Sequence, residues 1–483
     1  MVSPSRMRLA ATIFGILILT LVIGVFSTPF GSPTASFLTT QSKSSDLHFH
    51  LLLPATASNV DLCKLLLSAA ITGYHNPILI GWEGHGQYNG SESHLFKISE
   101  TLAYLNSLPP SADNDLVLVL DAYDIWLQLR PDVLIKRYHT AIEKANDRLK
   151  GEAIQGIDHG GAIIEQSILF GPDKTCWPDD ARRAACWAVP NSTLAADIFG
   201  PETDNWMVPN RPRWLNSGTI MGPAQDMRAM FAATMEMVHR KYDEEFKLRN
   251  SDQYYFQEMW AEQEIGRSMR RDGRVEAPLV KDDVRGTIPE ISRGIRTEFH
   301  VALDYESDVF QTSAAYTEYL TWMSFNHSTP LVDQAIGITK RIDQMVLSED
   351  IESSLPPFGN GGSNIALPKG KRWSDMMLGT NMITQQVFPV WHMTGEKSYR
   401  SRWWPRVWFH PHAEALLNVF KRETAERKKG TRVVAKVKGI SYTGAEIQLR
   451  EDHSETGVGV WTDQETFVPW DSMCGTYREG LFL

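Results

Sequence analysis

The stretch DLVLVLDAYD, residues 115–124, indicates the fold more strongly than any other part of this sequence. Residues 116–120 are all apolar, as expected for a strand that is buried on both faces of a parallel sheet covered by helices. Asp121 and Asp124 follow directly, and ligands of open parallel sheets bind beyond the carboxyl ends of the strands. Two carboxylates three residues apart can face one hard cation, Mn²⁺ or Mg²⁺. The plain alternative is a strand-end turn in which Asp124 caps a nearby group.

Apolar segments alternate with helical patterns on both sides of this stretch, which indicates an α/β domain of the nucleotide-binding kind with a mostly parallel sheet. Asn59 is a candidate N-cap for the first of the helices. Predicted strands cover residues 48–53, 77–82, 115–120, 162–170 and part of 209–223, and predicted helices cover 60–72, 97–105, 227–242, 252–262 and 411–427.

The N-terminus predicts a membrane anchor. Residues 9–26 carry no charge, and as a helix they would extend about 27 Å, close to the thickness of the hydrocarbon layer. Arg6 and Arg8 precede this segment, and the next basic residue is Lys43, which places the N-terminus in the cytosol. We therefore expect a cytosolic tail over 1–8, an uncleaved anchor over 9–26 and a flexible stem over 27–46. A cleaved signal peptide is the alternative.

Further features fit a luminal, single-pass type II protein of the endoplasmic reticulum or the Golgi. Asn89, Asn191 and Asn326 each begin a glycosylation triplet. Cys176 and Cys186 favour a short disulfide-closed loop over two free thiols in an oxidising compartment. The net charge of −10 argues against nucleic acid as a partner, because phosphate binding needs a surplus of Lys and Arg.

The motifs around residues 115–124 resemble, in order, those of the glycosyltransferase domain of procollagen lysyl hydroxylases and their relatives. The resemblance spans roughly residues 47–315 and implies the GT-A fold. It implies a hexosyltransferase that takes UDP-glucose or UDP-galactose, and it leaves the glycan or protein acceptor open. The similar segments are LVLVLDAYDIWLQLRP (116–131), CWPD (176–179), WLNSGTIMG (214–222), NSDQYY (250–255) and the pair formed by 303–304 with 310–311.

In that family, and in the glycogenin-like group, a histidine in a His-x-x-Gly context completes the metal site. His392, Gly395 and Lys397 match the glycogenin-like spacing, which implies that His392 joins Asp121 and Asp124 and that Gly395 and Lys397 approach the diphosphate. His327 is the rival third ligand. The resemblance adds a set of weaker candidates: Lys97, Asn216, Ser217 and Gly218 for the sugar nucleotide and Asp252 as the catalytic residue.

These features together predict a luminal GT-A-like domain over 47–428, with a mobile loop at 353–368 and a small β-rich appendage over 429–483. Plain structural roles compete for several residues: a solvated helix face for Lys97, a tight strand end for residues 216–218 and a helix start near Asp252. The rival function is a catalytically silent sugar- or nucleotide-binding membrane protein. A metal-dependent hydrolase is less favoured, because the sequence has neither G-x-S-x-G nor H-E-x-x-H.

Overall fold

The computed structural model describes residues 46–75, 77–90, 93–152, 154–158, 160–180, 182–272, 294–327, 331–332, 345–359, 367–425, 433–444 and 458–483. The predicted tail and anchor, and the stem up to residue 45, lie outside these residues, as does the part 360–366 of the predicted loop at 353–368. Within the described part, no helix combines the length and the apolar character needed to cross a membrane.

The central sheet is built around β3 (Leu116–Leu120), the strand predicted at residues 115–120. β1 (Asp46–Pro54) pairs with one edge of β3 in parallel, and β6 (Trp214–Pro223) pairs with the other edge antiparallel. The pairs β1–β2, β1–β15, β2–β16 and β5–β7 are also parallel, so the sheet is mixed and mostly parallel. Its further strands are β2 (Ile78–Ile80), β5 (Ile168–Asp173), β7 (Val301–Leu303), β14 (Val433–Val437), β15 (Ile440–Gly444), β16 (Gly459–Thr462) and β17 (Phe467–Pro469).

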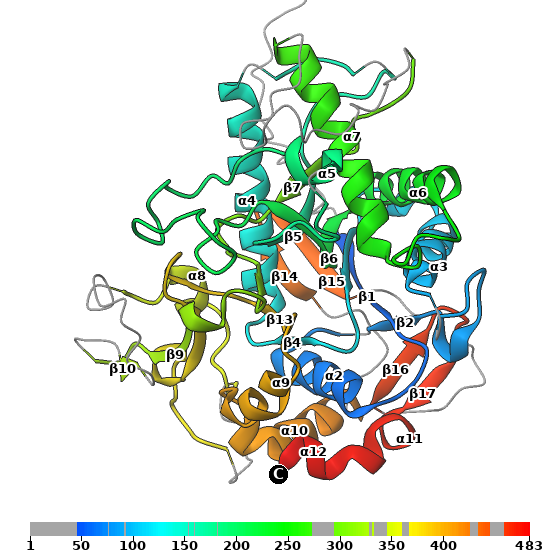
Figure 1. The fold of residues 1–483 in the computed structure, drawn as a ribbon. Coiled ribbons are helices and arrows are strands. Elements are labelled where there is room, and N and C mark those ends of the chain that lie inside the picture. Colours follow the sequence, from blue (N-terminus) through cyan, green and yellow to red (C-terminus); the bar gives the residue numbers. More distant parts are fainter. Residues whose placement is uncertain are drawn as a thin grey trace, which may run out of the picture. The chain divides into compact units, whose positions relative to one another are not determined.

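Helices cover both faces of this sheet, because neighbouring residues of its inner strands point into two different cores. In β1, Leu51 and Leu53 join one core while Leu52 joins the other. The first core contains α2 (Val60–Thr72) and α4 (Pro131–Gly151), and α10 (Ala413–Ala425) packs on α2. The second contains α3 (Leu95–Ser107), α6 (Ala224–Lys241) and α7 (Asp252–Asp272), so that α3 and α6 lie opposite α4 (Figure 1). This confirms the predicted layering.

Several local predictions are confirmed and others are wrong. α2 begins where predicted, because Asn59 Oδ1 accepts a hydrogen bond from the backbone N–H of Leu62 at 2.8 Å. The strand predicted at residues 162–170 instead begins at Ile168 and runs to Asp173, after a turn held by the Asp158 carboxylate. The helix predicted at 252–262 continues to Asp272. The predicted disulfide joins Cys176 to Cys186, which lies in the short helix α5 (Ala184–Trp187).

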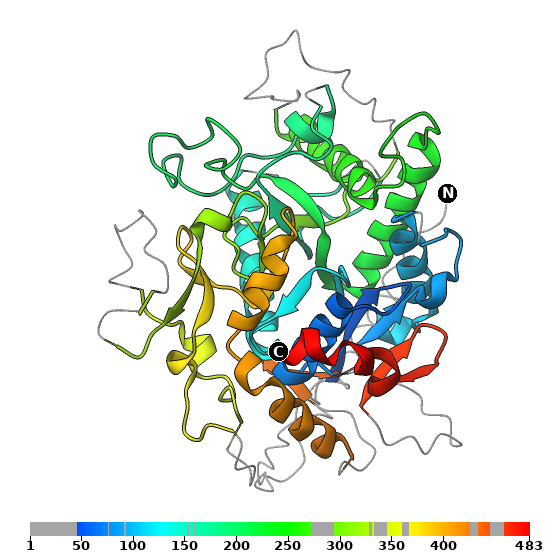
Figure 2. The same ribbon diagram turned by 60° about the horizontal axis from the view of Figure 1, so that its bottom comes forward.

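The C-terminal strands do not form a separate appendage, which corrects the prediction for residues 429–483. β15 pairs with β1, and β16 pairs with β2, so both belong to the central sheet. Figure 2 shows this C-terminal part against the N-terminal strands and α2. A second disulfide, Cys63–Cys474, joins α2 to α11 (Trp470–Cys474), which precedes α12 (Arg478–Phe482). Sequence patterns missed this arrangement because the partner strands lie at opposite ends of the chain.

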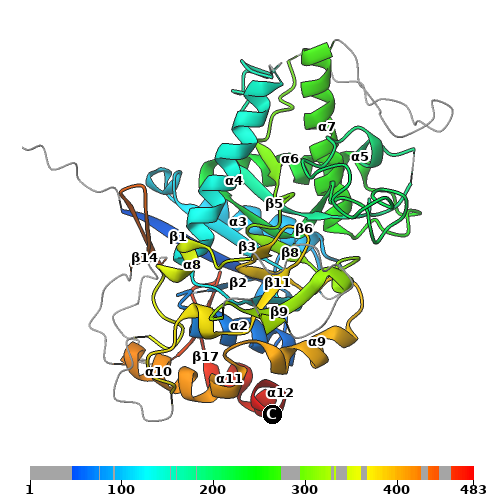
Figure 3. The same ribbon diagram turned by 90° about the vertical axis from the view of Figure 1, so that its left-hand side faces the viewer.

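Two smaller sheets complete the described part. One contains β4 (Ile125–Leu127), β13 (Val390–His392) and β8 (Phe310–Thr312). The other contains β9 (Leu320–Ser324) and β11 (Leu378–Asn381), seen together in Figure 3, with β10 (Leu331–Val332) and β12 (Gln386–Val387). Trp403, Trp404 and Trp408 are buried and form part of the core. α8 (Glu349–Glu352) and α9 (Ser398–Trp403) lie in the connections.

Candidate metal centre

The sheet topology brings three predicted metal ligands together from two distant segments. Asp121 follows the last residue of β3, and Asp124 directly precedes β4. β13 pairs with β4 so that His392 lies opposite Ile125, the residue after Asp124. The backbone N–H of Met393 then donates to the carbonyl oxygen of Asp124 at 2.7 Å. The pairing of β13 with β4 therefore brings His392 next to the two carboxylates, although they are far apart in the sequence.

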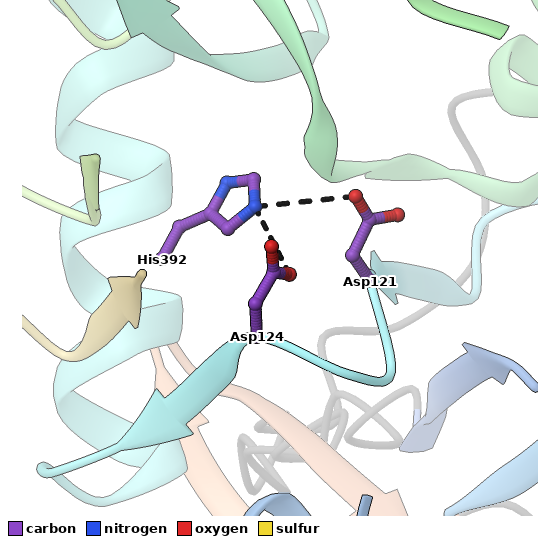
Figure 4. Close-up of side chains that lie close together, drawn as sticks. All are labelled: Asp121, Asp124 and His392. Atoms are coloured by element: carbon purple, nitrogen blue, oxygen red, sulfur yellow. Dashed lines mark ion pairs between the residues drawn. The ribbon is translucent and has the colours of Figure 1, made fainter. Parts of the chain in front are cut away.

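The three side chains converge on one point (Figure 4). Nε2 of His392 lies 3.2 Å from Oδ1 of Asp124 and 3.9 Å from Oδ2 of Asp121. One potential ligand atom from each residue lies within 4.8 Å of the other two. The imidazole is buried, whereas both carboxylates are half-buried and so remain open to a ligand. Two carboxylate oxygens and one imidazole nitrogen suit Mn²⁺ and also fit Mg²⁺.

Glycine at position 218 makes room for this group. A Cβ atom built on Gly218 would lie 2.1 Å from Cε1 of His392 and 2.8 Å from Oδ2 of Asp121. The Gly218 carbonyl also accepts a hydrogen bond from the Asp121 backbone N–H at 2.9 Å. The close approach of β6 to both ligands therefore requires a residue without a side chain. The residues present fit a bound divalent cation.

The charges of the site favour an ionised Asp124 and a protonated His392 when no cation is present. Burial alone would raise the pKa of Asp124, but His392, Arg400 and Lys97 hold it below its ordinary value. Burial alone would lower the pKa of His392, but Asp124, Asp121 and Asp173 raise it. A divalent cation would replace the imidazolium proton as the positive charge between the carboxylates.

Lys97 links the metal ligands to the predicted catalytic residue. Its ammonium lies 2.7 Å from Oδ1 of Asp121, is ion-paired with Asp252, and donates to the Ser217 carbonyl at 3.0 Å. Burial by itself lowers the pKa of Lys97, but the two carboxylates raise it above its ordinary value. Only 4% of Lys97 is exposed, so the residue does not lie on a solvated helix face, which was the alternative role predicted from the sequence.

Asn216 and Ser217 lie in the same network, which also contains groups that the sequence reasoning missed. Asn216 donates to the buried carboxylate of Asp173 at 2.9 Å, and Gln253 donates to the same oxygen at 3.3 Å. Burial raises the pKa of Asp173 above its ordinary value. The signal for Asp173 was its position at the end of a strand, but that strand had been predicted to end at residue 170.

Arg400 is the second missed group. Its guanidinium donates to Oδ2 of Asp124 at 3.2 Å and to the carbonyl of Tyr123 at 2.9 Å. It lies in α9, eight residues after His392, and only the strand pairing of β13 brings it to the carboxylates. Arg400 adds a fixed positive charge next to the predicted cation site.

The remaining candidates lie apart from this group. Gly395 is an exposed turn residue with φ +80°, and Lys397 is exposed at the start of α9. His327, the rival ligand, is exposed and does not belong to the three-residue group found among the described residues. The metal ligand set predicted with His392 is therefore the one that the geometry favours.

No protein-family model matches the sequence, and a comparison with curated proteins finds no relative.

Proposed function

We propose that this chain is a metal-dependent hexosyltransferase that takes its sugar from a UDP-sugar such as UDP-glucose or UDP-galactose. The main support is the convergence of Asp121, Asp124 and His392 at the carboxyl end of β3, where an α/β sheet binds ligands. Bound Mn²⁺ or Mg²⁺ would neutralise the charge of the departing diphosphate. The acceptor is a glycan or a protein.

The residues around the centre supply the remaining functions that such a transfer needs. Arg400 and Lys97 place two positive charges beside the carboxylates, where the diphosphate would lie. Asp252, paired with Lys97, orients the acceptor hydroxyl near the reacting carbon of the sugar. Because Gly218 has no side chain, the strand at residues 216–218 lies directly against His392 and Asp121, next to the place proposed for the donor.

The proposal includes a type II membrane topology with a luminal catalytic domain in the endoplasmic reticulum or the Golgi. The uncharged stretch at 9–26 and the preceding Arg6 and Arg8 support the topology. The two disulfides, Cys63–Cys474 and Cys176–Cys186, are typical of proteins in oxidising compartments.

Donor hydrolysis by the purified chain tests the function. A panel of nucleotide sugars is incubated with Mn²⁺ or with EDTA, and released UDP is measured. We expect UDP release from at least one donor with Mn²⁺ only, and a loss of at least about 100-fold in Asp124→Asn, because a metal ligand is weakened. His392→Ala should weaken Mn²⁺ binding, whereas His327→Ala serves as the matched control and should not.

Two other results would contradict the proposed transferase activity. UDP binding without release from any donor would favour the catalytically silent binding protein. A calorimetric titration that detects no UDP binding in the presence of Mn²⁺ would contradict the proposal that the chain is an enzyme.

A further inference from the structure

The hairpin of β16 and β17 reaches the carboxyl edge of the sheet beside β2 (Figure 1). β16 runs parallel to β2, with Thr462 opposite Leu79. The backbone N–H of Asp463, the next residue, donates to the Leu79 carbonyl at 2.9 Å. Asp463 therefore lies where β2 ends and the following loop begins, on the same edge of the sheet as the metal centre.

The Asp463 carboxylate holds the loop that follows β2. Its Oδ2 accepts a hydrogen bond from the Gly81 backbone N–H at 2.9 Å, and its Oδ1 lies 3.1 Å from Nε2 of His85. Nδ1 of His85 lies 2.6 Å from the carbonyl oxygen of Trp82. One carboxylate thus anchors the loop at two points, directly at Gly81 and through His85.

The loop needs such an anchor because its backbone is strained at Glu83, between glycines that adopt positive φ without strain. Gly81, Gly84 and Gly86 have φ values of +67°, +76° and +118°, and Glu83, which is not glycine, has a φ of +62°. A non-glycine residue in this region costs about 1 kcal/mol or more and persists only where its surroundings hold it. The contacts of Asp463 and His85 help to keep the loop in this conformation.

Hydrogen bonds continue from this loop to the metal motif. The Glu83 backbone N–H donates to the Thr56 carbonyl at 3.1 Å, which lies in the loop after β1. The Thr56 backbone N–H donates in turn to the hydroxyl of Tyr123 at 3.0 Å, and that hydroxyl donates to the Ala57 carbonyl at 3.0 Å. In the sequence, Tyr123 lies between Asp121 and Asp124. Hydrogen bonds therefore connect the loops after β1 and β2 to the segment that carries both aspartates.

The C-terminal segment also holds the loop after β1. The hydroxyl of Ser58 donates to the Met473 carbonyl, and the Tyr477 hydroxyl donates to the Ser58 carbonyl at 3.1 Å. The Cys63–Cys474 disulfide fixes this part of the segment to α2 covalently. Residues 458–483 thus contact the loops that follow β1 and β2, at the same edge of the sheet as the metal centre.

We propose that Asp463 is a positioning residue of the donor site, and that residues 458–483 set the shape of the loops that bind a nucleoside diphosphate. The inference rests on the proposed function, since it concerns how the same site takes its donor. Asp463 contacts neither of the metal-binding carboxylates in the described structure, so it acts through Gly81 and the loop. Loss of its carboxylate should weaken nucleotide binding and leave the cation site intact.

The test compares full-length variants by calorimetry with UDP in saturating Mn²⁺, and with Mn²⁺ alone. Asp463→Ala should raise the Kd for UDP about tenfold or more, because a charged acceptor is lost. Asp463→Asn keeps an oxygen acceptor for Gly81 and should stay within about threefold. His85→Ala removes a half-exposed partner of the same carboxylate and should raise the Kd in the same direction. Asp471→Ala, an exposed carboxylate of the same segment, is the matched control.

Kinetics of donor hydrolysis supply a second readout: in Asp463→Ala, KM for the donor should rise while kcat stays near the wild-type value. Equal UDP affinity in wild type and Asp463→Ala overturns this inference alone. Parallel loss of UDP and Mn²⁺ binding in Asp463→Ala also overturns it, because the residue would then support the fold in general. Failure of the wild-type chain to bind UDP with Mn²⁺ overturns the proposed function and this inference together.

Discussion

Single side chains decide whether the candidate centre can exist, and Gly218 shows this most directly. Its missing Cβ is the space into which His392 and Asp121 extend. Asp121 and Asp124 were predicted from their residue type and their place after a buried strand, and His392 from the resemblance to a known family. The need for glycine at 218 depends on a contact between β6 and β13 that local patterns do not encode. Lys97 illustrates the same limit, because only the fold reveals that it is buried between two carboxylates.

Gly218→Ala should lower Mn²⁺ affinity by at least about tenfold, because the new methyl group would force His392 or Asp121 out of position. Calorimetry with Mn²⁺ measures the effect. Gly151→Ala is the matched control, since a Cβ there meets nothing within 4 Å. Wild-type Mn²⁺ affinity in Gly218→Ala would show that the site relaxes around the methyl group, contrary to this expectation.

At the scale of elements, strands and helices were predicted well where a long apolar pattern defines them, as in β1, β3, α2 and α6. The segment between β5 and β6 has no such pattern, and its anchor is Lys174. The side-chain nitrogen of Lys174 lies over the rings of Phe199, Tyr316 and Tyr319, at 3.8, 4.1 and 4.5 Å from their centroids, and donates to the Val208 carbonyl. The lysine thus ties this segment to the residues after β8.

Lys174 should make stability depend on pH. Burial lowers its pKa to about 6, well below the ordinary value of a lysine. Between about pH 6 and about pH 10 the unfolded chain then binds a proton that the folded chain lacks, so stability falls as the pH is lowered through this window. The slope should be about 1.4 kcal/mol per pH unit, and it should vanish below the folded pKa.

Denaturant unfolding at several pH values between about 7 and about 9 measures this slope. Lys174→Met should remove it, whereas Lys150→Met, at an exposed position, should keep it. If wild type and Lys174→Met show the same slope, the three rings and the Val208 carbonyl keep the ammonium charged in the folded state.

At the scale of the whole molecule, the limit of the sequence analysis was long-range pairing. The patterns indicated a mostly parallel α/β sheet, but they gave no sign that β16 pairs with β2 or that Cys63 meets Cys474. An apolar pattern shows that a strand is buried and leaves its partner open. For that reason the C-terminal region was predicted as an appendage, and Asp463 was not considered.

The two disulfides should differ in their effect on stability. Cys63–Cys474 closes a sequence separation of 411 residues, and Cys176–Cys186 closes one of 10. In the chain-entropy model the longer loop contributes about 3 kcal/mol more to the free energy of unfolding. Denaturant unfolding of Cys63→Ala/Cys474→Ala and of Cys176→Ala/Cys186→Ala compares them directly. Equal losses would argue that native-state contacts, rather than loop closure, set the contribution of each bond.

The pairing of β16 with β2 also has a consequence for biosynthesis. β2 leaves the ribosome long before its partner strand β16 is made, because most of the described chain lies between them. At roughly 5–20 residues per second, the intervening chain takes about 20–75 s to synthesise. During that interval the edge of β2 has no β16 to pair with, and Gly81 lacks the Asp463 carboxylate. Until β16 is made, the nascent chain therefore presents an open strand edge that chaperones can bind, and the loop after β2 lacks its contact with Asp463.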